Sequence, residues 1–517
     1  MRIEGRIEHH TEDAIEWIED RVALSFEPPH TFCFETVIIM KKVTATLLCL
    51  SLLLLSGTFG ASEKPNILII LGDDCTHTDL PLYGGTNAKT PNIDRLATEG
   101  LTFNRAAITM AMCQPARSEL YSGQYPMRNG AAWNHCKSYV ETKSMPHYLG
   151  AQGYRVGISG KRHVLPEDSF PFEIIEGFDS ICVHNPTLPH HLEDVKAFME
   201  DDGQPFALVV GLVEPHKPWV MGDPSAYPPE SIDLPEYLVD NDATRESFSR
   251  YLAEITYMDN QVGEILEVLK ATGKANDTIV IYSSEQGAQW PGCKWTNWNL
   301  GVRTALVVKW PSHVPEGKRT DALVQWVDVV PTLLDIVGAD LSDYPFDGFS
   351  FKSVLLEGGE GQREFLYSMH NNTPEGPSYP IRAISDGRYK YIHNLDSDAI
   401  YINKWIMGRV QKSITTNQYW QSWLWESTTN EDAKRIVFRY MTRPEEELYD
   451  LENDPLEMHN LVSDEGLSEI KARLAQELTD WMVSQRDPGV QLDTRRAFEA
   501  ARNLEHVYRY SSIDQEK

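Results

Sequence analysis

Residues 65–74 read PNILIILGDD. The five consecutive apolar residues at 67–71 lie between a polar start and a Gly-Asp-Asp sequence, which is typical of a strand buried on both faces of a parallel sheet. Short apolar segments recur at 154–159 and 206–212, and amphipathic helical patterns alternate with such segments. This alternation predicts an α/β fold with a largely parallel, buried sheet.

The longest predicted helix covers residues 245–272. Its apolar residues, from Phe248 to Leu269, recur on one stripe, and Gly273 marks its end. A strand is predicted at 278–282, directly after it. A chain of 517 residues exceeds the size at which a single core stops growing, which is roughly 250 to 300 residues. We therefore expect one large domain and a smaller one.

The sequence pattern changes near Glu364, where the strand-like segments become antiparallel in character. Segments 381–384 and 389–392 flank an Asp-Gly pair, which is a hairpin signal. A helical apolar stripe follows at 467–482. We therefore predict a small antiparallel sheet packed by a helix. The expected boundaries are 64–360 for the large domain, 364–490 for the smaller one and 491–517 for a tail.

Residues 40–61 read MKKVTATLLCLSLLLLSGTFGA. Two lysines precede an apolar run that ends in small residues, which is the pattern of a signal peptide. The apolar run is shorter than the roughly 20 residues of a membrane span. We therefore expect an exported protein, periplasmic or secreted, without a stable membrane span. Residues 1–39 precede this signal, so we interpret them as a misassigned N-terminal extension.

The net charge restricts the classes of partner. The chain carries 76 acidic and 47 basic residues, a formal charge of -29. Nucleic acids and anionic membranes need a basic face, so neither is expected as a partner. Five cysteines lie beyond the signal, an odd number without metal-type spacing, so one thiol stays unpaired in an oxidising compartment. These are Cys75, Cys113, Cys136, Cys182 and Cys293.

Two segments carry candidate chemistry. Asp73 and Asp74 close the first predicted strand, and adjacent carboxylates at the carboxyl edge of a parallel sheet favour a hard cation over an exposed turn. The second segment is CQPAR at 113–117. Pro115 is typical of the first turn of a helix, which places Cys113 where free N–H groups stabilise a nucleophile or a bound anion. From spacing alone, a buried structural cysteine is an equal alternative.

The Cys-x-Pro-x-Arg segment resembles the signature of the formylglycine-dependent sulfatases, which belong to the alkaline-phosphatase-like superfamily. The resemblance covers about residues 64–490. The Glu-Gln pair at 285–286, the Lys-Trp-Thr element at 294–296 and residues 382–395 are most similar to the heparan N-sulfatase-like branch. It implies a large, mixed and mostly parallel sheet flanked by helices, with a smaller C-terminal α+β subdomain, and it makes 64–360 the catalytic domain. The other matching segments are TPNIDRLA (90–97), SGQYP (122–126), GY (153–154), GKRH (160–163), EPHKP (214–218) and VDVVPTLL (327–334).

The resemblance implies an exported sulfatase that hydrolyses sulfate esters, or N-sulfates, of a sulfated carbohydrate. An ulvan-type algal polysaccharide and a heparan-type glycosaminoglycan are the expected substrate classes. A formylglycine-generating enzyme or an anaerobic sulfatase-maturing enzyme would oxidise Cys113 to formylglycine. One hydroxyl of the hydrated aldehyde would attack sulfur, and the other would later expel sulfate. Two alternatives are a phosphate or phosphonate ester hydrolase of the same superfamily and a non-catalytic protein that binds sulfated glycans.

The resemblance also implies a metal site, with Ca²⁺ as the expected ion and Mg²⁺ as an alternative. Glu285 and Gln286 stand where most family members carry Asp followed by Asn or His. Each retains a terminal oxygen but adds one methylene, which still suits a hard ion. The implied ligands are Asp73, Asp74, residue 113, Glu285 and Gln286.

The remaining matched residues have implied roles in catalysis and substrate binding. Arg117 would steady the hydrated aldehyde, and Lys161 and Lys294 would bind sulfate oxygens. His163 would take part in proton transfer and His216 would protonate the departing alcohol. His135 is assigned to the sugar pocket, together with Trp133, Asn134 and Lys217, although ordinary loop packing is an equal alternative for these four.

Overall fold

The computed structural model describes residues 64–408 and 417–509. The predicted extension at 1–39 and the predicted signal peptide at 40–61 lie outside the described residues. Within the described ranges, no helix is both long enough and apolar enough to cross a membrane.

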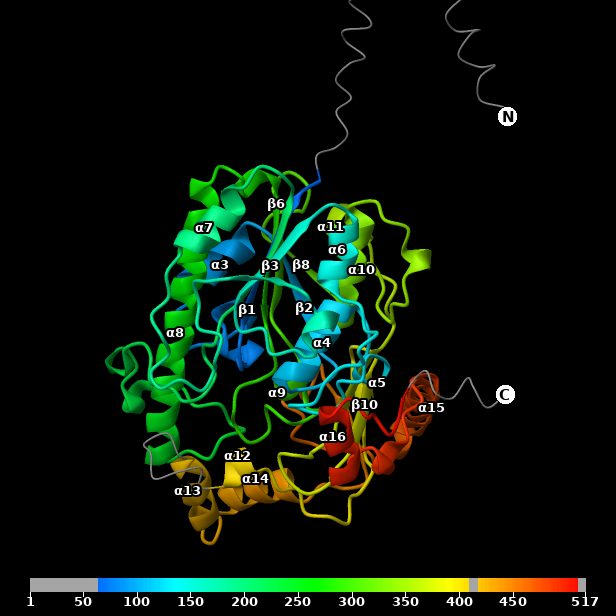
Figure 1. Cartoon of the computed structure of the whole chain (residues 1–517). Coiled ribbons are helices and arrows are strands. Elements are labelled where there is room, and N and C mark those ends of the chain that lie inside the picture. The colour runs from blue at the N-terminus through cyan, green and yellow to red at the C-terminus, as the bar shows by residue number, and fades with distance from the viewer. Residues whose placement is uncertain (1–63, 409–416, 510–517) are drawn as a thin grey trace, which may run out of the picture. The chain divides into compact units, whose positions relative to one another are not determined.

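An eight-stranded sheet forms the centre of the larger part of the molecule (Figure 1). Its order is β4-β3-β5-β1-β6-β7-β2-β8. Strand β7 is antiparallel to both of its neighbours, and the other pairs are parallel. The predicted α/β fold with a mostly parallel sheet is therefore confirmed. The strands are β1 (Asn66–Gly72), β2 (Leu101–Ala107), β3 (Arg155–Gly160), β4 (Glu173–Ile175), β5 (Phe206–Gly211), β6 (Thr278–Ser284), β7 (Leu306–Lys309) and β8 (Lys318–Gln325).

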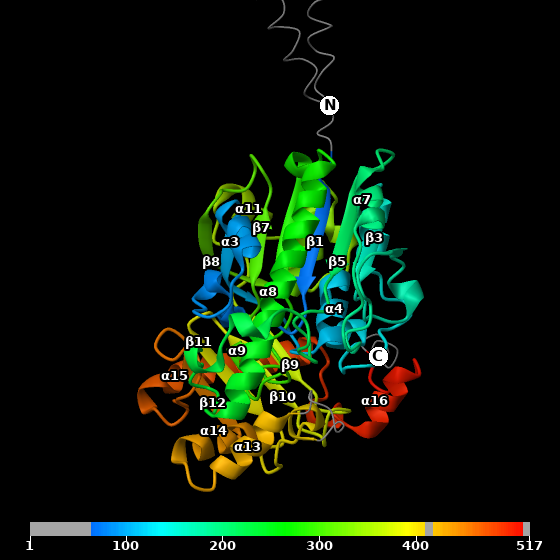
Figure 2. The same cartoon turned by 90° about the vertical axis from the view of Figure 1, so that its left-hand side faces the viewer.

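Strand β1 is fully buried between two helical layers. Its side chains alternate between the faces of the sheet, so Leu68 and Ile70 join one hydrophobic core and Ile67 and Ile69 join the other. The first core includes α3 (Pro91–Thr98), α7 (Glu193–Glu200) and α8 (Asp242–Ala271). The second includes α4 (Cys113–Ser122), α6 (Met145–Ala151), α10 (Val329–Ile336) and α11 (Lys352–Glu357). Figures 1 and 2 show the two sets of helices on opposite faces.

Helix α8 begins three residues before its predicted start at 245. Asn241 is the reason, because its side chain accepts a hydrogen bond from the Thr244 N–H and so caps the helix. Two short helices, α5 (Pro126–Asn129) and α9 (Asn299–Val302), lie in loops that follow α4 and β6.

The C-terminal part contains a separate four-stranded antiparallel sheet of order β12-β11-β10-β9. The predicted hairpin is present, and Asp386 accepts hydrogen bonds from the backbone N–H groups of Arg388 and Tyr389. The predicted helix at 467–482 is α15, which packs against β10 and β11. The bounds are β9 (Leu366–His370), β10 (Ile381–Ser385), β11 (Tyr389–Asn394), β12 (Glu446–Asp450) and α15 (Ser468–Ser484).

Three helices between β11 and β12 were absent from the sequence prediction, and a further helix lies in the predicted tail. Hydrogen bonds join this C-terminal part to loops of the large sheet: Tyr401 Oη donates to the Trp295 carbonyl, and Lys390 Nζ donates to Asn299 Oδ1. Figure 2 shows the smaller sheet below the ends of the large-sheet strands. The helices are α12 (Lys404–Met407), α13 (Gln418–Glu426), α14 (Glu431–Met441) and α16 (Arg495–Arg502).

Candidate active site

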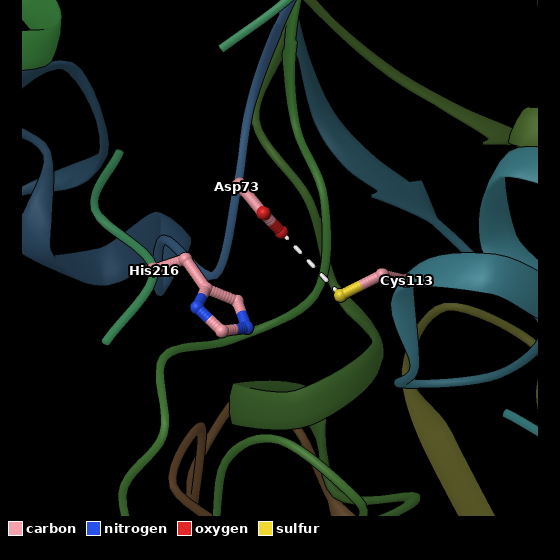
Figure 3. Close-up of side chains that lie close together, drawn as sticks. All are labelled: Asp73, Cys113 and His216. Atoms are coloured by element: carbon pink, nitrogen blue, oxygen red, sulfur yellow. Dashed lines mark hydrogen bonds between the residues drawn. The ribbon is translucent and has the colours of Figure 1, made fainter. Parts of the chain in front are cut away.

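At the carboxyl end of β1, the side chains of Asp73 and Asp74 both point toward Cys113. In an extended strand, the side chains of Asp73 and Asp74 would point in opposite directions. Asp74 instead has a φ of 56°, in the left-handed region that non-glycine residues seldom adopt. Both side chains are fully buried. Asp73 Oδ1 lies 3.4 Å and Asp74 Oδ1 3.8 Å from Cys113 Sγ, and Figure 3 shows the first of these contacts.

Cys113 is the first residue of α4, as predicted, and only 2% of it is exposed. Burial and the neighbouring Asp73 raise the pKa of its thiol well above the usual value. The unmodified thiol therefore stays protonated and is a poor nucleophile. In a formylglycine an oxygen replaces the sulfur, so Sγ marks the position that this oxygen would take.

The residues around Cys113 can hold a divalent cation. Ligand atoms of Asp73, Asp74, Cys113 and Glu285 all lie within 4.8 Å of one another. Gln286 Nε2 donates to Asp74 Oδ1 at 2.6 Å and to Cys113 Sγ at 3.0 Å. Its Oε1 is buried without a hydrogen-bond partner among the described residues, and rotation of the amide would turn this oxygen to the same centre. Three carboxylates and an amide oxygen fit a hard cation.

Two buried lysines neutralise the aspartates. Lys161 Nζ pairs with Asp73 Oδ2, and Lys294 Nζ lies 2.6 Å from Asp74 Oδ2 and 3.4 Å from Cys113 Sγ. Burial disfavours the charged lysine, but Asp73 together with the other anionic neighbours outweighs burial and holds the pKa of Lys161 well above its usual value. Burial likewise opposes the charge on Lys294, and Asp74 together with the other anionic neighbours raises that pKa. Both lysines therefore remain cationic beside residue 113.

Arg117 lies one helical turn after Cys113 and contacts residues that line the site. Its guanidinium pairs with Glu285 and donates a hydrogen bond to the Lys161 carbonyl. Burial opposes the charge, yet Glu285 together with Asp73 and other neighbours outweighs burial and raises the pKa of Arg117. Arg117 thus fixes a carboxylate of the metal cluster and the backbone of a lysine.

His216 faces the cluster from the loop after β5 (Figure 3). Its Nδ1 lies 2.6 Å from the Lys217 carbonyl, which can only accept, so Nδ1 carries a hydrogen. Its Nε2 lies 3.5 Å from Asp74 Oδ2. Burial disfavours the imidazolium, but Cys182 and Asp74 outweigh it and raise the pKa of His216 to about 9. The imidazole is therefore protonated near neutral pH and can donate a proton.

Two further predicted histidines lie beside each other at the site. The ring centroids of His135 and His163 are 5.4 Å apart, and both residues have a left-handed φ. Burial and the positive Lys161 hold the pKa of His163 well below its usual value, so this ring is neutral. His135 Nε2 lies 3.9 Å from Glu375 Oε1.

The C-terminal part supplies neighbours of the site that the sequence analysis missed. Asn134 Nδ2 donates to Glu375 Oε1 at 3.1 Å, and Trp405 Nε1 donates to the other oxygen. Lys217 contacts Asn417. Trp133 belongs to the hydrophobic core, as expected from ordinary packing. No local pattern marks Glu375, Trp405 or Asn417, because each meets the site only through long-range folding.

Comparisons with known proteins agree with this geometry. Residues 65–339, more than half of the chain, match the family model described as "Sulfatase". The chain belongs to the sulfatase family. As a member, it is a sulfuric ester hydrolase. Residues 294–412 also match the model "N-sulphoglucosamine sulphohydrolase, C-terminal", which confirms the resemblance to the heparan N-sulfatase-like branch.

Relatives of this sulfatase include proteins with named substrates. It is 29% identical over 442 residues to an ulvan-active sulfatase of Formosa agariphila, covering 84% of this chain and 83% of that protein. It is 26% identical over 487 residues to the human N-sulphoglucosamine sulphohydrolase, covering 86% of this chain and 94% of that protein.

Solved structures show the same fold. A putative sulfatase from Bacteroides fragilis aligns with a TM-score of 0.64 and 20% identity over 84% of this chain and all of that one. A phosphonate monoester hydrolase of Agrobacterium radiobacter aligns with a TM-score of 0.61 and 19% identity, over 81% of this chain and 96% of that chain. The fold therefore does not by itself select sulfate over phosphonate.

Proposed function

We propose that this sulfatase is exported and removes sulfate from a sulfated oligo- or polysaccharide by means of a formylglycine at residue 113. One observation carries the proposal: three buried carboxylates and three buried cations surround Cys113. Such a charge-balanced cluster, once it also holds a divalent cation, suits an anionic group such as a sulfate ester, which carries one negative charge and must be bound and cleaved away from water. The names of the ulvan-active and N-sulphoglucosamine relatives support a glycan of the ulvan or heparan type.

The modified residue and the cation each supply one kind of chemistry. Hydrated formylglycine supplies a hydroxyl that attacks sulfur and a second hydroxyl that later expels sulfate. A bound cation supplies polarisation of the sulfate. We assign it as Ca²⁺, because Glu285 and Gln286 bring longer, more adaptable oxygen ligands than Asp and Asn would.

The other site residues bind the sulfate and move protons. Lys161 and Lys294 have cationic Nζ atoms next to Cys113 Sγ and Asp73, where they would bind sulfate oxygens. Arg117 keeps Glu285 in place. Neutral His163 can accept a proton from the attacking hydroxyl, and protonated His216 can donate one to the leaving oxygen.

We assign different roles to the parts of the chain that contain the two sheets. Residues 64–360 would carry the chemistry, and 364–490 would complete the rim, since Glu375 holds Asn134 and lies near His135. His135 would contact the sugar. The further proposed partner is a maturing enzyme that oxidises Cys113 during export.

A direct test uses protein from a host that produces formylglycine. Peptide mass spectrometry should find residue 113 as formylglycine, and the protein should release sulfate from ulvan-type or heparan-type oligosaccharides. Faster turnover of phosphate or phosphonate esters would assign it to the other ester class instead. Tight binding of the oligosaccharides by fully modified protein without any sulfate release would overturn the proposal.

A further inference from the structure

Lys217 follows the proposed proton donor in the chain, but its ammonium is turned away from the metal cluster. Its Nζ lies 4.9 Å from the ring centroid of Trp219 and 4.7 Å from that of Tyr419. It also donates a hydrogen bond to Asn417 Oδ1. We call Lys217, Trp219, Asn417 and Tyr419 the lysine box.

In the lysine box, the side-chain nitrogen of Lys217 lies over two aromatic rings and has no carboxylate partner among the described residues. Burial, reinforced by the charge of Arg250, lowers the pKa of Lys217 to about 7, so its charged and neutral forms are both populated near neutral pH. The charged form is held between the two rings by cation–π attraction, which is directional and strengthens when water is excluded, and either form can donate the hydrogen bond to Asn417. The rings are themselves fixed, because the buried Trp290 has its centroid 4.8 Å from that of Trp219 and 4.6 Å from that of Tyr419. Lys217 is therefore anchored in one position.

Asn417 and Tyr419, the two members of the box that come from the C-terminal part, are held by further hydrogen bonds. Asn417 Nδ2 donates to the carbonyl oxygens of Trp405 and Ile406. Tyr419 Oη donates to the Gln289 carbonyl at 2.8 Å. The side chain of Lys217 thus joins the loop after β5 to the start of α13.

The backbone next to the lysine box is hydrogen-bonded to His216. The Lys217 carbonyl accepts the hydrogen bond from His216 Nδ1 at 2.6 Å. Trp219 Nε1 donates to the Pro215 carbonyl at 2.9 Å, which closes the loop on itself. With Nδ1 held in this way, Nε2 faces Asp74, on the side of residue 113.

We propose that Lys217 is a positioning residue, which through the lysine box holds His216 in the orientation needed to protonate the leaving oxygen of a sugar sulfate. This inference rests on the proposed function, in which His216 is the proton donor. The sequence alone is compatible with a place for Lys217 in the sugar pocket or with ordinary loop packing. The box gives it a third role, in which it touches no substrate.

Leaving groups of different basicity test this role. A sugar alkoxide leaves only when it is protonated, whereas 4-nitrophenolate is stable as an anion and needs no proton donor. Loss of His216 orientation should therefore slow sugar sulfates selectively. Damage to the sulfate-binding residues or to the fold should slow both substrates alike.

The experiment compares kcat on a sulfated ulvan oligosaccharide, or a heparan-type one if that is the better substrate, with kcat on 4-nitrophenyl sulfate. Lys217→Met keeps the aliphatic stem and removes the charge, and Asn417→Ala removes only the amide partner. We expect Lys217→Met to lower kcat on the sugar sulfate about 10- to 100-fold, because misplacing the donor removes part of the roughly 10²- to 10⁴-fold that general acid catalysis supplies, and to change kcat on the aryl sulfate less than about threefold. Lys217→Arg, which retains the charge, should restore most of the sugar-sulfate rate.

The matched control is Lys352→Met. Lys352 is also held by a polar partner, Asp335, but it lies on α11 in the other helical layer. Neither rate should change in this variant.

A double-mutant cycle separates positioning from a general structural effect. In a His216→Ala background, Lys217→Met should cause no further loss on the sugar sulfate, because the two residues act through one proton transfer. Equal losses on both substrates, no loss on either, or additive losses in the cycle would each overturn the inference while the wild type remains a sulfatase. If modified wild-type protein released sulfate from neither substrate, the proposed function would fail and the inference with it.

Discussion

Two buried arginines show how a functional charge cluster differs from a structural one. Arg382 in β10 and its partner Asp487 are fully buried, and all five guanidinium N–H groups have acceptors. Arg117 in α4 is equally buried, but its Nη2 has no hydrogen-bond partner among the described residues. Both pairs cost desolvation energy, and only the first is fully compensated by hydrogen bonds.

The backbone shows the same contrast. Asp74, His135, His163 and Trp295 all have a left-handed φ close to the Cys113 cluster. The strands that hold Arg382 pair in a regular antiparallel register. Left-handed backbone also occurs at Arg486, beside Asp487, and unsatisfied polar atoms also occur in the C-terminal part. The site is therefore distinguished by the gathering of four left-handed residues around one buried charge cluster, and the burial of charge alone does not distinguish it.

The sharpest test of this comparison is Cys113→Ala. Removal of the nucleophile should lower sulfate release by at least about 10⁴-fold, as loss of a covalent nucleophile does in other hydrolases. The thermal unfolding midpoint should stay near that of the wild type, because Cys113 contributes no packing that alanine cannot largely replace. A large fall in the midpoint would show that the cluster is structural after all.

The matching test in the C-terminal part is Arg382→Met. It leaves the Asp487 carboxylate buried without its partner, so unfolding should become easier by about 3–5 kcal/mol. Sulfate release per folded molecule should be unchanged. Adding Asp487→Leu should recover most of the lost stability, and urea unfolding of the three proteins measures this. A selective loss of turnover in folded Arg382→Met would remove the contrast between the two arginines.

Gln286→Leu tests the unsatisfied amide oxygen of the cluster. The substitution keeps similar volume but removes a proposed ligand, so Ca²⁺ affinity should fall roughly 10- to 100-fold. Calorimetric titration of protein freed of metal by a chelator measures this directly. Gln289→Leu, on the same loop, is the control and should leave Ca²⁺ affinity unchanged, since Gln289 contacts Trp405 instead. Equal affinities in wild type and Gln286→Leu would exclude this side chain as a ligand.

The prediction with the smallest effect at neutral pH concerns His370 in β9. Burial and Arg443 lower the pKa of His370 to about 3, against about 6.5 in an unfolded chain. The neutral ring is therefore favoured by folding, and its contribution to stability is present above pH 6.5 and is lost as pH falls toward 3. The slope should approach about 1.4 kcal/mol per pH unit between those values. Urea unfolding of wild type and His370→Gln should show a shallower pH dependence in the variant, and identical curves would contradict the assignment.

Much of the site could be predicted from short sequence segments, because the ends of strands and helices depend mainly on neighbouring residues. The apolar run of β1 puts Asp73 at the end of a central strand, and Pro115 fixes the start of α4 at Cys113. The Asp-Gly pair similarly defines the hairpin between β10 and β11.

The rest depends on contacts between distant segments. The antiparallel direction of β7 follows from its connections, and no residue within it encodes that direction. Asn417 meets Lys217 across 200 positions of sequence. Helix α12 has only four residues and gives no periodic signal. Helix α14, by contrast, has an Asn430 cap, an acidic first turn and an amphipathic pattern, which are local signals that could have predicted it.

The burial of Cys113 also sets a time limit on the maturation proposed for this chain. Once α4 packs beside β1, a residue that is only 2% exposed is beyond the reach of another enzyme. The cluster cannot close until Glu285 has been made, 172 residues after position 113 (285 − 113). At about 5–20 residues per second, synthesis of that stretch takes roughly 10 to 30 s. The order of strands along the chain thus delays closure and would give the proposed maturing enzyme a kinetic window on an unfolded peptide.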